Sequence, residues 1–260
     1  MSVVMIVSAL MSGAAVGALL GLFGGGGSVL ATPLLLYVVG IDDPHVAIGT
    51  SAAAVAFNAG VNLLAHGRSG RVKWPCAAVF AAAGLLGSFF GSSLAKAVDG
   101  QKLLLFFAAA MAAIALSMLR RPRSAGDPGV HITLPMMAKL APMGVLTGLA
   151  AGFFGIGGGF LIVPGLMAAT GMTLANAAAS SLLSVSVFGA ATSLNYALSG
   201  QVNWPIAALF VLGGLGGGAL GVRGAGLLAG HVGLARRLFA GLVLLVAGYV
   251  AWRALGLSSI

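Results

Sequence analysis

Two glycine-rich segments are the part of this sequence whose residue types and spacing point most directly to binding chemistry. The first covers Gly24 to Gly27 and the second covers Gly155 to Gly159, and each leads into a short apolar run, which we expect to begin as a helix at Ser28 and at Phe160. Glycine lets a ligand approach the main chain closely. The N–H groups and dipole of a helix start attract anions. The segments therefore predict a small-anion site built mainly from backbone amides.

Hydroxyl and amide side chains could complete this site. Hydroxyls in membrane helices often bond back to their own helix, and a buried asparagine can instead join two helices, so structural roles remain open for these side chains. The predicted substrate-binding residues are Gly24, Gly25, Gly26, Gly27, Ser28, Thr50, Ser51, Asn58, Gly155, Gly157, Gly158, Gly159, Ser180 and Ser181.

Other chemistries lack the side chains they need. The four histidines are scattered and Cys76 is the single cysteine, so no metal-ligand spacing is present. There is no phosphate-binding GxxxxGK[ST] loop, and no carboxylate falls inside an apolar run, where a proton or sodium carrier would place one. We therefore expect no catalytic residue, no metal and no cofactor.

Composition indicates what must hold these segments in place. Of 260 residues, 60% are apolar and only 7% are charged, whereas a soluble domain needs roughly 25% charged residues to cover its surface. Disordered chains are polar, so disorder is excluded as well. The 13 basic residues fall in short gaps between apolar runs and form no basic face with aromatics, which argues against a nucleic-acid partner. The sequence predicts a polytopic protein of the lipid bilayer.

The apolar runs predict an all-α polytopic membrane protein. A membrane helix needs about 20 apolar residues, and eight runs approach or exceed that length: 2–23, 45–65, 75–95, 103–119, 135–155, 173–196, 205–222 and 238–255. Two further runs, 28–40 and 159–170, are too short to cross comfortably and predict half-helices or re-entrant segments. Helices fit these lengths better than barrel strands do.

The two halves of the chain repeat each other. Gly21 to Gly27 with Pro33 matches Gly152 to Gly158 with Pro164 at an offset of 131. Farther along, the offset is 130, which pairs Thr50-Ser51 with Ser180-Ser181. The same offset pairs the Gly-x-Val-x-Trp-Pro motif at 70–75 with that at 200–205. The sequence therefore predicts a first transmembrane repeat at 1–119, a basic cytoplasmic linker at 120–134 and a second repeat at 135–260.

Charge predicts that the second repeat is inverted. The loop 68–73 carries three basic residues and its counterpart 198–203 carries none, and cytoplasmic loops are the basic ones. An inverted arrangement puts ten basic residues inside, namely Arg68, Arg71, Lys73, Arg120, Arg121, Arg123, Lys139, Arg223, Arg236 and Arg237, and leaves Lys96, Lys102 and Arg253 outside. Inverted repeats with broken helices are typical of secondary transporters that bind substrate near the midplane.

Other glycines recur at helical spacing and predict close helix packing instead of ligand contact. These are Gly13, Gly17 and Gly21, Gly84, Gly87 and Gly91, and Gly214, Gly217 and Gly221.

Over essentially its whole length the chain resembles the TauE/SafE sulfite-exporter family. The resemblance is carried by GLFGGGGSVLATP and GFFGIGGGFLIVP, by the Thr-Ser and Ser-Ser pairs, and by Gly-x-Val-x-Trp at 70–74 and 200–204. It implies an integral protein of the bacterial inner (cytoplasmic) membrane that moves sulfite, organosulfonates or related anions, commonly outward.

Three other functions stay open on the sequence. A passive anion channel, or an importer of another small anion, could use the same glycine segments. A membrane enzyme would need a nucleophile and base at membrane depth, which the sequence does not offer. The oligomeric state is not fixed, and a homodimer is one state compatible with the sequence.

Overall fold

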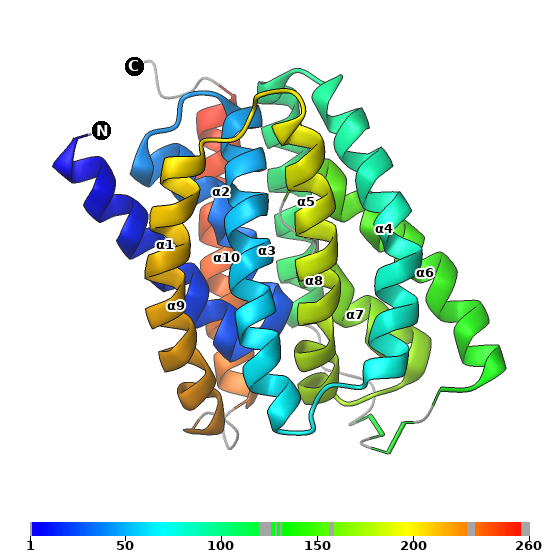
Figure 1. The fold of residues 1–260 in the computed structure, drawn as a ribbon. Coiled ribbons are helices and arrows are strands. Elements are labelled where there is room, and N and C mark those ends of the chain that lie inside the picture. The colour runs from blue at the N-terminus through cyan, green and yellow to red at the C-terminus, as the bar shows by residue number, and fades with distance from the viewer. Residues whose placement is uncertain are drawn as a thin grey trace.

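The computed structural model describes residues 2–119, 126–127, 129–130, 132–155, 159–227 and 232–255 and has an all-α fold (Figure 1). Its described residues contain no strand, only one isolated bridge between Asp127 and Met172. Within the described ranges, eight helical stretches are long and apolar enough to cross a membrane, which confirms the prediction of an all-α polytopic protein. The elements are α1 (Val3–Phe23), η1 (Gly24–Leu30), α2 (Ala31–Leu34), η2 (Leu35–Val39), α3 (Pro44–Arg68), α4 (Trp74–Lys96), α5 (Gly100–Leu119), α6 (Leu134–Phe154), α7 (Gly159–Thr170), α8 (Leu174–Ala197), α9 (Trp204–Leu227) and α10 (Val232–Ala254).

The first membrane helix breaks at Gly24. This residue has φ +64° and ψ −146°, a conformation that residues with a side chain rarely adopt. The chain then coils as a 3₁₀ helix in η1, continues through α2 and ends in the π-helical η2. The short helical segment therefore begins four residues before the predicted start at Ser28, because the glycines themselves coil. The second short helix begins at Gly159, one residue before its predicted start.

The two halves run in opposite directions in Figure 1. α1 begins at the upper end of the molecule, and the chain returns to that end through α2 before α3 descends. α6 begins at the lower end, and the chain returns there through α7 before α8 ascends. This order is compatible with the predicted inversion of the repeat, which stays a prediction.

Charged segments divide between the two ends. The loop that joins α3 to α4 carries Arg71 and Lys73 and lies at the lower end, as does the start of α6 with Lys139. The loop that joins α4 to α5, close to Lys96 and Lys102, lies at the upper end. Because cytoplasmic loops are enriched in Lys and Arg, the lower end is the one we expect to face the cytoplasm.

Glycine stripes join the halves. α1 packs on α9 and α4 packs on α6, so each pairing takes one helix from each half. A Cβ placed on Gly13, Gly17 or Gly21 would run into the main chain of α9, and one placed on Gly87 or Gly91 would run into that of α6. The prediction that these glycines serve close packing is therefore confirmed. Small residues let membrane helices approach closely where lipid supplies no hydrophobic drive.

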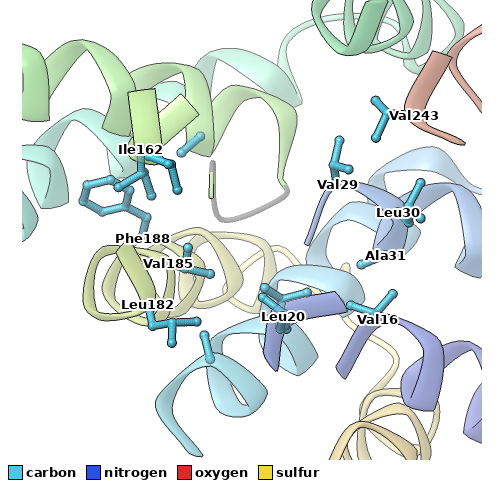
Figure 2. Packing of buried hydrophobic residues seen from close by; sticks show 14 of the residues in the cluster. Val16, Leu20, Val29, Leu30, Ala31, Ile162, Leu182, Val185, Phe188 and Val243 are labelled. Carbon is cyan, nitrogen blue, oxygen red and sulfur yellow. The ribbon is translucent and has the colours of Figure 1, made fainter. Parts of the chain in front are cut away.

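The apolar core lies where the short segments meet the long helices. Figure 2 shows Val16 and Leu20 of α1, Val29 and Leu30 of η1, and Val185 of α8 turned toward a common interior. Outside this core, large apolar side chains such as Phe90, Leu146 and Leu245 are more than half exposed. An apolar exterior of this kind suits a surface that faces lipid.

Candidate anion site

The two glycine segments meet at the centre of the molecule. A Cβ added to Gly159 would overlap the main chain of Gly25, and one added to Gly25 would fall 2.8 Å from the Cα of Gly159. η1 and α7 are in contact along this junction. Because neither residue has a side chain, the two backbones come together without an intervening group.

The break at Gly24 redirects two hydrogen bonds. In an unbroken helix, the N–H of Gly25 would donate to the carbonyl of Gly21. Here it donates to Oγ of Ser181 on α8, 3.1 Å away, and the Gly21 oxygen lies 3.3 Å from Nε2 of His66 on α3. Side chains from two other helices thus satisfy groups that the break sets free.

Ser51 and Ser181 hold corresponding positions across the junction. Oγ of Ser181 donates to the Ala178 carbonyl at 2.7 Å while it accepts from Gly25. Oγ of Ser51 lies 2.9 Å from the Ile48 carbonyl and 3.4 Å from the Gly155 carbonyl. Both serines are fully buried. Each serine therefore bonds back to its own helix and also touches the glycine segment of the other half.

Thr32 adds a hydroxyl that the sequence prediction missed. Its Oγ1 lies 2.9 Å from Oγ of Ser51, and either atom can donate. Thr32 is almost fully buried in α2. The sequence offered one indication of this role: Thr32 follows Ser28 by four residues, one helical turn along the same short segment.

Thr50 and Ser180 have a clear structural role. Oγ1 of Thr50 accepts from the N–H of Asn203, and Oγ of Ser180 accepts from the N–H of Lys73, both at 2.9 Å. These amides directly precede Trp204 and Trp74, where α9 and α4 begin. Each hydroxyl therefore anchors the start of a helix in the other half, and its own proton remains available to another acceptor.

Gly26, Gly27 and Ser28 differ in the space around them. A Cβ on Gly26 would meet only Phe239 and Phe23, at 3.9 and 4.0 Å, whereas one on Gly27 would collide with the main chain at Leu19. Ser28 is buried and donates to the Gly25 carbonyl at 2.8 Å. Gly26 is therefore the one glycine of this segment beside which a side chain fits.

A buried polar stripe runs along α3 from the centre toward the lower end. Asn58 is 1% exposed, and neither polar atom of its side chain has a hydrogen-bond partner among the described residues. Nδ2 of Asn62 donates to the Asn58 carbonyl at 2.9 Å, and His66 follows one turn later. A Cβ on Gly214 or Gly218 of α9 would collide with the two asparagines, so glycines form the surface opposite them.

No acidic side chain opposes an anion at this depth. Asp42, Asp43, Asp99 and Asp127 are all the acids of the chain, and each lies outside the helices. Among the described residues, no three His, Cys, Asp or Glu side chains gather as a metal site would require. The junction therefore offers neutral hydrogen-bond donors without a fixed negative charge.

Comparison with known proteins identifies the family. The profile described as Sulfite exporter TauE/SafE matches residues 9–250. The chain belongs to the TauE/SafE family. A "Probable membrane transporter protein" of Xylella fastidiosa (strain Temecula1) is 54% identical to it over 93% of each chain. The "Probable membrane transporter protein YunE" of Bacillus subtilis is 28% identical over 84% of this chain and 86% of its own. No solved structure matches the chain. The protein is thus an integral membrane transporter.

Within this TauE/SafE protein the structure brings five of the fourteen predicted site residues together. Gly25, Gly155, Gly159, Ser51 and Ser181 surround the junction of the two segments. Gly24 forms the break, while Asn58 lies two turns along α3 from Ser51. Gly157 and Gly158 lie outside the described residues. Whether any of these residues binds substrate stays a prediction.

His66 is the second residue that the sequence prediction missed. Taken alone, it is one of four scattered histidines. A signal was present, since His66 follows Asn62 by four residues, as Asn62 follows Asn58, and residues at that spacing share one face of a helix. Its bond to Gly21 places it beside the break in α1.

Proposed function

We propose that this transporter exports a small sulfur-containing oxyanion, sulfite or a short organosulfonate, across the bacterial inner membrane. The anion binds where Gly25 and Gly159 meet, near the middle of the molecule between the two halves. The observation that carries the proposal is this contact between two glycine segments, each bordered by a serine of the other half. The family description supports the choice of substrate class.

Donors at the junction would exchange partners when the anion binds. The Gly25 N–H now donates to Ser181, and the Ser181 proton is held by a backbone carbonyl. An oxyanion between the segments can accept both protons. Hydrogen bonds to an ionised acceptor are roughly twice as strong as neutral ones. The stronger bonds therefore offset part of the cost of removing the anion from water.

The membrane potential can drive export of an anion without a coupling ion. The membrane potential, negative inside, favours outward movement of each negative charge by about 2.3 kcal/mol per 100 mV. All four acids of the chain lie outside the helices, so no membrane-embedded carboxylate carries a proton or sodium ion. We therefore expect uniport of the anion, driven by the potential and by its concentration gradient.

A thermal-shift screen of the purified protein tests the substrate. Sulfite, sulfate, thiosulfate, sulfoacetate and taurine are compared, and the substrate should raise the melting temperature. A ligand at 100 times its Kd stabilises the folded state by about 2.7 kcal/mol. Stabilisation by none of the sulfur anions would contradict the proposed substrate class.

Gly26→Leu tests the binding segment. A Cβ on Gly26 meets only Phe239 and Phe23, so we expect this variant to fold, and its side chain should displace the adjoining Gly25 amide and reduce the sulfite shift. Gly216→Leu on α9 is the matched control, since a Cβ there meets nothing within 4 Å, and it should keep the shift. Unchanged sulfite affinity in Gly26→Leu would exclude the proposed segment.

Sulfite flux in proteoliposomes distinguishes the proposed exporter from a passive channel and from an importer. In proteoliposomes under an imposed potential, a transporter exchanges internal and external labelled sulfite at a rate that saturates with concentration. A channel shows no acceleration by sulfite on the opposite side. If the protein is inserted in one known orientation and moves labelled sulfite only toward its cytoplasmic side, the importer is favoured.

A further inference from the structure

A groove lies on the surface of the second half. The groove has a volume of about 330 Å³ and lies between α6 and α7. Its lining consists of Ala138, Lys139, Pro142, Met143, Ala168 and Ala169. Lys139 is exposed and stands in the second turn of α6. The groove is thus mostly apolar, with one positive charge.

The equivalent place in the first half carries a tyrosine. At the offset of 131, Ala168 corresponds to Tyr37. The Tyr37 ring packs edge-on against Tyr249 with centroids 5.1 Å apart, and the Arg253 guanidinium lies 5.5 Å from the Tyr37 centroid. The alanine of the second half has no ring to make contacts of this kind.

Two further differences change the chemistry of that space. Lys139 stands where the first half has Ser8, and Pro142 stands where it has Met11. Proline has no N–H, so the carbonyl of Ala138 loses the donor it would have in a regular helix. Beside the apolar groove, the Lys139 ammonium and the free carbonyl of Ala138 are therefore features of the second half that the first half does not share.

We infer that this groove binds an anionic phospholipid, with the phosphate on Lys139 and an acyl chain along Met143 and Ala169. The groove is lined by the second and third turns of α6 and by the end of α7. α6 begins at the lower end of the molecule, which also carries the basic loop 69–73 (Figure 1). Anionic headgroups gather at the cytoplasmic surface, and basic pockets between membrane helices on that side recruit them. A lysine stem can lie along apolar surface while its ammonium reaches the headgroup region. The inference does not depend on which anion is transported.

Native mass spectrometry of the intact protein tests this site. The protein is titrated with phosphatidylglycerol and with phosphatidylcholine of the same acyl chains, and the wild type should retain phosphatidylglycerol preferentially. Lys139→Gln should weaken phosphatidylglycerol binding about fivefold, the effect of one lysine near a membrane surface. Lys102→Gln, which removes an exposed lysine at the opposite end, should leave the preference intact.

Ala168→Tyr tests the groove separately from the charge. It restores the residue type of the first half and fills the space, so it should abolish the preference while Lys139 remains. Ala109→Tyr at an exposed position of α5 is its control and should change nothing. Wild-type preference in both Lys139→Gln and Ala168→Tyr would overturn the inference. Equal losses in Lys139→Gln and Lys102→Gln would overturn it too, because they would show an effect of net charge alone.

Discussion

α3 and α8 hold equivalent places in the two halves and pack against each other, yet they agree over only part of their length. Near the glycine segments they match: Thr50 and Ser180 anchor helix starts, and Ser51 and Ser181 touch the opposite segment. Two turns farther along they differ. Asn58, Asn62 and His66 on α3 correspond to Phe188, Thr192 and Tyr196 on α8.

The two helices therefore have corresponding contacts near the glycine segments and different side-chain roles farther along. Phe188 is fully buried and lies near the Phe80 ring, with centroids 6.4 Å apart. Asn58, in the equivalent place, is about as deeply buried, but its amide has no partner in the part of the chain that the structure describes. A buried polar group without a hydrogen bond costs about 1–3 kcal/mol. At this one position α3 therefore carries a cost in stability that Phe188 spares α8, which suits a residue kept for transport.

Making α8 resemble α3 should have the largest effect. Phe188→Asn removes a buried ring and leaves a second amide without a partner. Loss of a buried Phe side chain alone costs about 3–5 kcal/mol, so we expect this variant to fail to fold or to melt far below the wild type in a thermal unfolding scan. Phe188→Leu keeps an apolar side chain and should lose much less. Similar melting of Phe188→Asn and the wild type would show that the site is not a packed core.

Making α3 resemble α8 should change stability in the opposite direction. Asn58→Leu replaces the unpartnered amide with an apolar group of similar volume, and we expect a gain of about 1–2 kcal/mol in the free energy of unfolding. Sulfite flux in proteoliposomes should fall, because the central polar group is lost. A variant that is more stable and equally active would assign Asn58 no role in transport.

The shared hydroxyls should behave as a pair. Thr50→Val and Ser180→Ala each remove an acceptor from a backbone amide at a helix start, and each should cost about 1 kcal/mol, as loss of an N-terminal cap does. Urea or thermal unfolding of the two variants checks this. Costs that differ by more than a factor of three would show that the two halves do not use these hydroxyls alike.

The long helices could be predicted from the sequence because lipid imposes a simple rule. A run of about 20 apolar residues must form a helix, since no water is present to satisfy its backbone. The glycine stripes could be predicted from their helical spacing, and each of the nine glycines lies in close contact with a neighbouring helix. The predicted break at Gly24 was also confirmed. The sequence did not indicate that the glycines after it form the 3₁₀ helix η1.

The partners of the site residues could not be read from the sequence. Thr50 and Ser51 are adjacent, yet they face different elements because successive residues on a helix point about 100° apart. One meets Asn203 and the other Gly155, contacts that depend on how the second half docks on the first. His66 was missed for the same reason, since its role depends on the Gly21 carbonyl that the break leaves without its usual donor.

The smallest expected effect contrasts His66 with Tyr196, the pair nearest the ends of α3 and α8. His66→Ala removes the ring nitrogen from the Gly21 carbonyl and should cost about 0.5–1.5 kcal/mol, the net value of one hydrogen bond. Tyr196→Phe removes a buried hydroxyl that has no partner among the described residues, so it should be neutral or slightly stabilising. Thermal unfolding of both variants measures the contrast. A larger loss from Tyr196→Phe than from His66→Ala would mean that the upper end of α8, and not the lower end of α3, holds a polar contact the fold depends on.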